Sequence, residues 1–377
     1  MFKSVFKIKK EKCKILYISP GLESGGAENI LYNVVISQNR EDIVLISMTT
    51  IGYYGYQLRQ RGYRVIALNM KKNILIFFKF LKLIFFISKL KPQIVHTWLY
   101  HGNLIGGIIA KILRVKKIYW SVHHDFEYSN ILTMLEMQIL RILSYLIPEK
   151  IIFCSSSSKN NHLKNGYKKS CSLLIRNGVS FKKFKPNKKY RKETRENLNI
   201  GNNCLVLGNI SRFHPLKDHD NLFKSLSIIK EKNIDFICII AGIGLSKENK
   251  LLKNKINKYK VQDKVKLIGK CNEIFKIVNA FDLNVLTSKK ESFPVNLLEA
   301  MASGVPCLST DVGDAINIIG NTGWVVDSEN PLALAKCIEK ISKNKHLLKD
   351  RSLMARQRII DNFSLEIMNE DYRKLYC

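Results

Sequence analysis

Short apolar runs alternate with longer helical patterns along this chain, and this alternation constrains the fold more than any other feature. Strands that are apolar throughout, separated by helices, are typical of a parallel sheet covered on both faces. The pattern stops in a polar, lysine-rich segment at 182–203 and then starts again. The predicted strands are 15–19, 43–47, 65–68, 94–96, 117–120 and 151–154, followed by 205–208, 236–240, 265–268, 283–286 and 305–308.

Two sets of strands predict two domains, and a length of 377 residues exceeds the usual size of one. We expect two doubly wound, Rossmann-like α/β domains that face a central cleft. The first spans 1–185 and the second 186–361, with a helix at about 362–377 crossing back to the first. Ligands of such sheets bind at the carboxyl ends of the strands, so the cleft is the expected site.

The chain is strongly basic, with 62 Lys and Arg against 31 Asp and Glu and a net charge of +31. Such an excess favours polyanionic partners: nucleic acid, anionic lipid or phosphorylated substrates. No helix-turn-helix, RNA-recognition or zinc-finger pattern accompanies the charge. A nucleic-acid binder is therefore the weakest of the functions considered, and we expect no nucleic-acid partner.

Nine cysteines are scattered along the chain, and no two have the C-x-x-C spacing of a zinc or redox site. Free cysteines in apolar runs indicate a reducing, cytoplasmic location. The first ten residues are basic but lack the apolar core of a signal peptide, so we expect no export.

The stretch from Glu291 to Glu299 places two carboxylates on either side of an apolar turn. Pro294 fits the first turn of a helix, because its missing N–H would be unpaired there. A helix N-terminus suits a phosphate, and the flanking carboxylates could accept hydrogen bonds from sugar hydroxyls. The spacing thus fits a nucleotide-sugar site, although two glutamates around a helix are also typical of a solvated face.

Other residues with binding chemistry follow predicted strands. Gly25 and Gly26 precede a helix, and Gly242 ends a strand, so backbone could approach a ligand closely at each. Arg212 and Lys217 would supply fixed positive charge to a departing diphosphate. Asp218 looks like a helix N-cap rather than a metal ligand, and we predict no metal site.

These motifs resemble those of retaining glycosyltransferases of family 4, which have the GT-B fold. The resemblance rests on the E-x7-E spacing with the following Glu-Ala-Met-Ala-Ser-Gly-Val-Pro, the Arg-x4-Lys spacing and Gly-Gly-Ala-Glu near the N-terminus. It implies that Glu291 contacts the donor sugar and Glu299 the ribose, with Phe293 and Pro294 beside them. It places a histidine near the reacting carbon; the register favours His124, and His123 stays open.

The resemblance implies transfer of a sugar from a nucleoside diphosphate sugar, expected to be UDP-linked, to a glycan or lipid-linked acceptor. Configuration at the sugar would be retained, with neither metal nor cofactor. Bacterial surface polysaccharide or lipopolysaccharide biosynthesis is the expected setting. A nucleotide-sugar epimerase with a similar fold is the alternative, and it would release no free nucleoside diphosphate.

The segment 71–91 is unusually apolar and aromatic, but it is too short to span a membrane and contains Lys79 and Lys82. At helical spacing Lys72 and Lys89 extend these into one basic stripe. We expect this helix to bind an anionic surface on the inner face of the cytoplasmic membrane. The alternative is an ordinary helix buried against the sheet.

Overall fold

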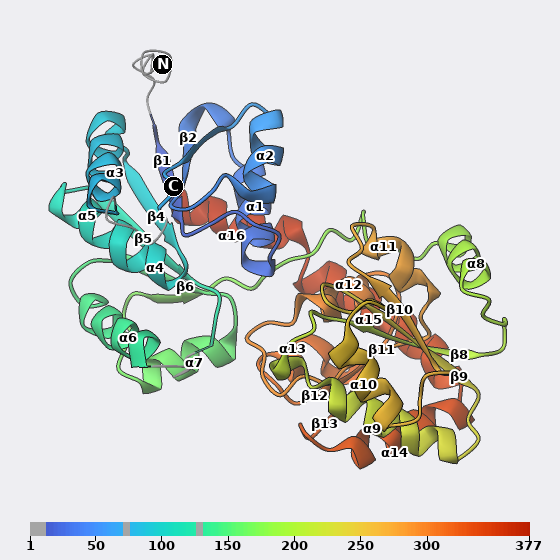
Figure 1. The fold of residues 1–377 in the computed structure, drawn as a ribbon. Helices are drawn as coiled ribbons and strands as arrows, with labels where there is room; N and C mark the ends of the chain where they lie inside the picture. Colours follow the sequence, from blue (N-terminus) through green and yellow to red (C-terminus); the bar gives the residue numbers. More distant parts are fainter. Residues whose placement is uncertain (1–12, 71–75, 126–130) are drawn as a thin grey trace. The chain divides into compact units, whose positions relative to one another are not determined.

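The computed structural model describes residues 13–70, 76–125 and 131–377, and it divides into two compact units. Unit 1 comprises residues up to Arg176 together with Met368–Cys377, and unit 2 comprises Asn177–Ile367. The limits expected from the sequence lie nearby, at 185 and about 362. Each unit contains one parallel sheet with helices on both faces (Figure 1). The predicted fold class, two Rossmann-like α/β domains, is thereby confirmed.

The sheet of unit 1 has seven strands in the order β3-β2-β1-β4-β5-β6-β7. All neighbouring pairs are parallel, and the order reverses beside β1, as in a doubly wound sheet. The elements of this unit are β1 (Ile15–Ser19), α1 (Gly26–Ile36), β2 (Ile43–Ser47), α2 (Gly52–Gln60), β3 (Arg64–Ala67), α3 (Ile76–Leu90), β4 (Ile94–Trp98), α4 (Leu99–His101), α5 (Gly107–Ile112), β5 (Lys117–Val122), α6 (Ile131–Leu143), β6 (Lys150–Phe153), α7 (Ser156–Lys164) and β7 (Ser172–Leu174).

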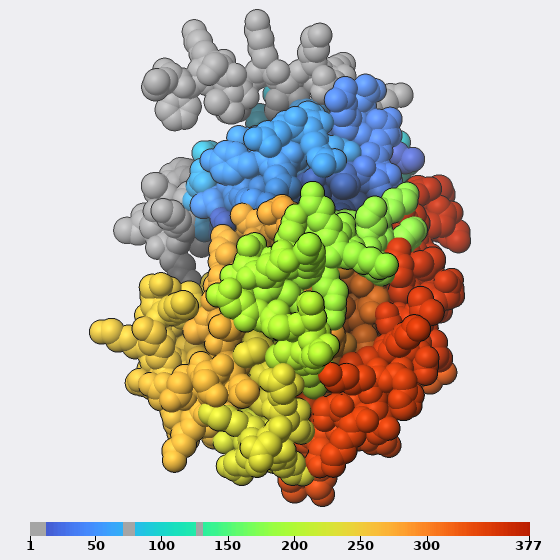
Figure 2. Space-filling model, turned by 90° about the vertical axis from the view of Figure 1, so that its right-hand side faces the viewer, coloured from blue at the N-terminus to red at the C-terminus, as the bar shows by residue number. Residues whose placement is uncertain are grey.

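The sheet of unit 2 has six parallel strands in the order β10-β9-β8-β11-β12-β13. In Figure 2, α8 in lime lies beside the gold segment that includes α11, and the two helices are in contact. The elements are α8 (Lys188–Asn197), β8 (Leu205–Ile210), α9 (His219–Glu231), β9 (Phe236–Ala241), α10 (Lys250–Lys258), β10 (Val265–Gly269), α11 (Ile274–Ile277), β11 (Leu283–Leu286), α12 (Val295–Ala302), β12 (Cys307–Thr310), α13 (Ala315–Ile319), β13 (Trp324–Val326), α14 (Pro331–Lys343), α15 (His346–Asn362) and α16 (Leu365–Tyr376), whose last residues belong to unit 1.

Eleven of these strands correspond to predicted ones, and the remaining two, β7 and β13, were missed. Both have three residues and lie at the edge of their sheets, where an apolar run is too short to be recognised. The strand predicted at 305–308 is shifted, since β12 begins at Cys307.

The two faces of the unit 1 sheet are covered by different helices. Leu83 of α3, Ile109 of α5 and Met137 of α6 pack in one apolar core with alternate residues of the strands. On the opposite face the end of α16 packs against a buried aromatic and polar cluster around His96. The C-terminal helix is therefore an integral part of unit 1.

Tyr376 anchors this helix through hydrogen bonds deep in the unit 1 core. Its hydroxyl lies 2.7 Å from His96 Nδ1 and accepts a hydrogen bond from the Tyr17 hydroxyl at 2.9 Å. The other His96 nitrogen lies 2.8 Å from the Ser121 hydroxyl. Burial lowers the pKa of His96 to about 3, so the ring is neutral at physiological pH.

Replacing Tyr376 with phenylalanine should destabilise unit 1 by about 1–3 kcal/mol, because the ring stays while the buried His96 Nδ1 loses its partner. Urea unfolding measures the loss. Tyr56→Phe is the matched control, since Tyr56 is 61% exposed and should cost almost nothing. Equal stability of the two variants would mean that the anchor contributes nothing.

The helix α3 presents two different faces, as the sequence had left open. Leu83, Ile87 and Leu90 are buried in the unit 1 core. Leu81, Ile84 and Phe85 are exposed. Part of the predicted segment, residues 71–75, lies outside the described chain, as do the side chains of residues 76–79.

Candidate functional site

The site residues predicted in the second half of the chain lie at the carboxyl edge of the unit 2 sheet. They occupy the three loops that follow β8, β9 and β11, apart from Glu299, which lies in α12. Backbone hydrogen bonds join these loops: Phe213 N donates to Ile243 O at 2.8 Å, and Lys289 N donates to Leu216 O at 2.8 Å. The three loops therefore form one surface at the place where ligands of such sheets bind.

Lys217 and Glu291 form an ion pair on this surface, a contact that the sequence did not predict. Their side chains are 19% and 13% exposed, respectively. Ser288 Oγ donates a second hydrogen bond to the same Glu291 oxygen, at 2.7 Å. Thr287 Oγ1 in turn donates to Lys217 O at 3.1 Å and holds the lysine loop in place. An ammonium and a carboxylate are thus presented side by side, fixed by the loops that carry them.

Arg212 lies in the first of these loops and is exposed. Within residues 13–70, 76–125 and 131–377, no carboxylate forms an ion pair with it, so its guanidinium could bind an external anion. Asp218, at the end of the same loop, caps α9 by accepting a hydrogen bond from Asn221 N at 3.3 Å. The prediction that Asp218 is a helix cap is thereby confirmed.

Gly242 allows the loop after β9 to approach the loop after β8. Its φ of 144° is one that side-chain-bearing residues rarely adopt, and a Cβ there would lie 1.7 Å from Ser211 O. Glycine is therefore required at this position for steric reasons. The backbone of Gly242 thus lies against Ser211, the residue before Arg212.

The helix α12 begins directly after Pro294, as predicted. Phe293 and Pro294 are both buried, and the Phe293 ring lies 6.2 Å from that of Phe363. The loop after β12 supports the turn from outside: a Cβ on Gly313 would lie 2.5 Å from Glu291 O, and Asp314 N donates to Ser292 O at 3.2 Å. The backbone of Glu291 is therefore fixed by packing on both sides.

Glu299 is the fifth residue of α12 and is half-buried. Burial raises the pKa of this carboxyl to about 7, and the positive charge of Lys183 opposes the shift only in part. Nothing in the sequence indicated this. The group changes its charge near neutral pH, which makes it a candidate for function.

The two glycines predicted in unit 1 lie where α1 begins. Gly25 is the N-cap residue, and Gly26 is the first residue of the helix. A Cβ on Gly25 would lie 2.1 Å from a carboxylate oxygen of Glu28, whereas one on Gly26 would meet nothing within 4 Å. The Glu28 carboxylate therefore lies at this helix N-terminus, the position at which a phosphate would bind.

The two candidate histidines follow β5 and differ in their surroundings. His123 is buried and stacks on Trp98, with ring centroids 4.4 Å apart. Neither of its ring nitrogens has a hydrogen-bond partner among the described residues, and burial lowers its pKa to about 3. His124 is exposed, and its backbone oxygen accepts a hydrogen bond from Ser158 Oγ at 2.7 Å. Trp98 itself is fully buried, as core packing requires.

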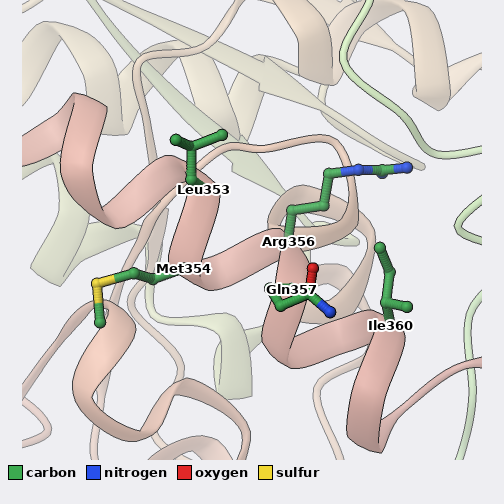
Figure 3. A pocket seen from close by; sticks show the side chains of 5 residues that line it. All are labelled: Leu353, Met354, Arg356, Gln357 and Ile360. Atoms are coloured by element: carbon green, nitrogen blue, oxygen red, sulfur yellow. The ribbon is translucent and has the colours of Figure 1, made fainter.

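A hollow of about 470 Å³ lies along α15, and none of the predicted site residues lines it (Figure 3). Its lining comes entirely from one helix: Leu353, Met354, Arg356, Gln357 and Ile360. Its one charged lining residue, Arg356, donates hydrogen bonds to the backbone oxygens of Phe184, at 3.2 Å, and Ala302, so this guanidinium is already used within the protein and we do not assign the site there.

Two further features concern metals and membranes. Within the described ranges, no three His, Cys, Asp or Glu side chains come close enough to hold a metal ion. In the same residues, no helix has the length and apolar character needed to cross a membrane.

Two family profiles match the chain and together cover most of it. Residues 24–183 match "Glycosyltransferase Family 4", and residues 185–358 match "Glycosyl transferases group 1". Their junction lies between the two sets of strands.

Individual relatives and structures agree with this match. The Staphylococcus aureus capsular polysaccharide biosynthesis glycosyltransferase CapM is 26% identical, over 85% of this chain and 87% of its own. An Escherichia coli UDP-Gal:alpha-D-GlcNAc-diphosphoundecaprenol alpha-1,3-galactosyltransferase is 26% identical, over 81% and 79%. The crystal structure of Anabaena HepE in complex with UDP and glucose superposes with a TM-score of 0.86 at 19% identity, covering 96% of this chain and 99% of that one.

The fold and the family profiles lead to the same conclusion. The two parallel sheets have the GT-B architecture, and the profiles cover both units. The chain belongs to the family 4 glycosyltransferases of the GT-B fold.

Proposed function

We propose that this glycosyltransferase transfers a sugar from a UDP-sugar to a glycan or lipid-linked acceptor, with retention of configuration at the anomeric carbon. The observation that carries the proposal is the Lys217–Glu291 pair, together with the exposed Arg212 in the same loop as Lys217. A sugar linked to a diphosphate needs both partners that this pair offers, cations for the phosphates and a carboxylate for the hydroxyls. That HepE binds UDP and glucose in its crystal structure supports the same class of donor.

The proposed roles follow from charge and position. Arg212 and Lys217 bind the diphosphate and stabilise the negative charge that grows on it as the bond to the sugar breaks. Glu291 accepts hydrogen bonds from the donor sugar, and Glu299 accepts them from the ribose. The backbone at Gly25, Gly26 and Gly242, with Phe293 and Pro294, shapes the space around the donor.

Retention is proposed without a covalent sugar–enzyme intermediate. The electron pair of the broken bond leaves with the diphosphate, and the acceptor oxygen bonds to the same face of the sugar. The acceptor proton passes to the departing phosphate oxygen. Glu291 supports this proposal, because its carboxylate is already held by Lys217 and by the Ser288 hydroxyl and is not free to attack the sugar. The two fixed cations do the work for which other transferases use a metal, so we propose that none is needed.

A histidine beside the reacting carbon completes the proposed site. The sequence register favours His124, while His123 has ring nitrogens without partners among the described residues and is held by stacking on Trp98. Alanine at each position in turn distinguishes the two, since only the residue that contacts the donor should lower kcat strongly.

The proposed acceptor is a phosphate-linked glycan on a lipid, in the assembly of a bacterial surface polysaccharide. The names of the relatives support it: CapM belongs to capsular polysaccharide biosynthesis, and the Escherichia coli enzyme acts on a diphosphoundecaprenol-linked sugar. Nine free cysteines support a reducing compartment, which would place the enzyme on the cytoplasmic side of the membrane.

Donor binding should weaken as the pH falls below 7. Because the pKa of Glu299 is raised to about 7, its carboxyl is mostly protonated at pH 6 and mostly ionised at pH 8. Only the ionised form can accept hydrogen bonds from both ribose hydroxyls, so the Kd for UDP should be about tenfold higher at pH 6 than at pH 8. Calorimetric titration measures it. The Glu299→Gln variant shows how much of the pH dependence comes from the nucleotide's own phosphate. If its Kd changes with pH as strongly as that of the wild type, the assignment of Glu299 is contradicted.

The test of the proposed activity is a panel of nucleoside diphosphate sugars, each incubated with the protein, EDTA and an extract of bacterial glycolipids. Release of UDP from one donor, increased by the extract, is the expected result. Conversion of the donor to an isomer without nucleotide release would instead indicate an epimerase. Activity that appears only when a divalent metal replaces EDTA would overturn the metal-independent mechanism.

A further inference from the structure

The helix α6 of unit 1 exposes an apolar face that nothing in the described chain covers. Met137 and Leu140 point into the core and are buried. On the outward side, large apolar residues recur every three or four positions, so they form a continuous stripe along the helix and the turn after it. This α6 stripe consists of Ile131 (72% exposed), Leu132 (76%), Leu135 (50%), Ile139 (46%), Ile142 (57%) and Leu146 (61%).

The neighbouring helices extend the apolar surface. α3, α5 and α6 cover the same face of the unit 1 sheet, with α5 next to α3, and Figure 1 shows them along one side of the unit. α3 contributes Leu81, Ile84 and Phe85, and α5 contributes Ile112, which is 71% exposed. More than half of the large apolar side chains exposed in the described residues lie on these three helices and the turn after α6. An apolar area of this kind marks an interaction site.

The charged residues on this surface are almost all basic. Lys82, Lys89, Lys111 and Lys116 are exposed on or beside α3 and α5, and neither helix contains an acidic residue. The single glutamate of α6, Glu136, has a side chain only 11% exposed and is paired with His101. The surface is therefore apolar at its centre and positively charged around it.

We propose that this surface docks onto an anionic lipid bilayer, with the α6 stripe in the interface and the lysines among the headgroups. The α6 stripe would enter the acyl boundary as the apolar face of an interfacial helix does. A helix of 13 residues is too short to cross the bilayer, so α6 would lie in its plane. Each lysine near an anionic surface adds to the binding and makes it sensitive to salt.

Charge distinguishes this partner from a second copy of the chain. A contact with a second copy would set one basic surface against another, and the exposed acidic residue just after the α6 stripe, Glu149, offers only one carboxylate per copy. An anionic bilayer neutralises the basic surface instead. The purpose of the docking rests on the proposed lipid-linked acceptor. Because α6 follows β5 in the chain, docking through α6 would bring the carboxyl edge of β5 close to the lipid headgroups.

Flotation with phosphatidylglycerol–phosphatidylcholine vesicles tests the proposal on the full chain. The test variant Leu132→Ser/Leu135→Ser/Ile139→Ser removes the centre of the α6 stripe at exposed positions. The control variant, Leu251→Ser/Leu332→Ser/Leu353→Ser, removes three comparably exposed apolar side chains from unit 2. At low salt the test variant should lose at least about tenfold in vesicle partitioning, while the control floats like the wild type.

Three outcomes would overturn the proposal: equal flotation of the test variant and the wild type, flotation that is no stronger on anionic than on neutral vesicles, or a wild-type dimer in light scattering that the test variant dissociates. UDP titration of the same proteins separates this inference from the proposed function. Wild-type UDP binding by a test variant that no longer floats supports both. Vesicle binding by a protein that binds no UDP would leave the docking surface standing and remove its proposed purpose.

Discussion

Lys217→Ala should lower kcat by about 100- to 1,000-fold while the protein stays folded, because the variant removes a fixed cation from the departing diphosphate. Glu291→Ala should be similarly impaired, since the same pair is broken from the other side. The effects should not add: the double variant should be little worse than either single one, as expected for two groups that act as a unit. Nucleotide release under saturating donor is the measurement.

Lys289→Ala is the matched control for loss of a lysine in this region. Lys289 lies two residues before Glu291, but its ammonium pairs with Glu329, at 2.5 Å, and with Asp218, at 3.8 Å, rather than with Glu291. Its side chain is 41% exposed, so its removal should change kcat by no more than about twofold. A Lys217→Ala enzyme as active as Lys289→Ala would show that the donor binds elsewhere.

Asp282→Ala should destabilise unit 2 by about 3 kcal/mol, because it leaves a buried arginine without its anion. Asp282 accepts hydrogen bonds from Arg195 at 2.8 Å, from Arg191 at 2.5 Å and from Val206 N at 2.8 Å. Arg195 is only 4% exposed. Urea unfolding measures the loss in free energy.

Asp263→Ala provides the comparison. Asp263 pairs with Lys230, but its side chain is 54% exposed, and exposed pairs contribute under about 1 kcal/mol. A loss of the same small size in both variants would mean that the buried arginine finds enough compensation in its carbonyl contacts, of which the one to Ala280 O is 3.1 Å long.

Much of the fold could be predicted because the strands are buried on both faces. Each strand is therefore an apolar run in the sequence, and it can be recognised without knowing which strands lie beside it in the sheet. The polar, lysine-rich segment at 182–203 shows what composition does not reveal, because it contains α8, whose Arg195 is buried against Asp282. Charge alone does not reveal that a basic residue has a partner far along the sequence.

The sequence predicted which residues the site contains and that most of them follow strands, but it did not predict the contacts between them. That Asp218 caps α9 follows from local spacing, and the structure agrees. That Lys217 pairs with Glu291 depends on two loops meeting at one sheet edge. The apolar α6 stripe was missed for a related reason: Leu132 and Leu140 are equally apolar in the sequence, and only packing decides which one is exposed.

UDP titration of the wild type and of Arg212→Ala/Lys217→Ala, each at two salt concentrations, tests the central claim most directly. The claim is that the loops at the carboxyl edge of the unit 2 sheet bind a nucleoside diphosphate. The wild type should bind UDP with an affinity that falls as salt increases, and the double variant should lose both the affinity and most of its salt dependence. Binding by the double variant with wild-type affinity would contradict the account.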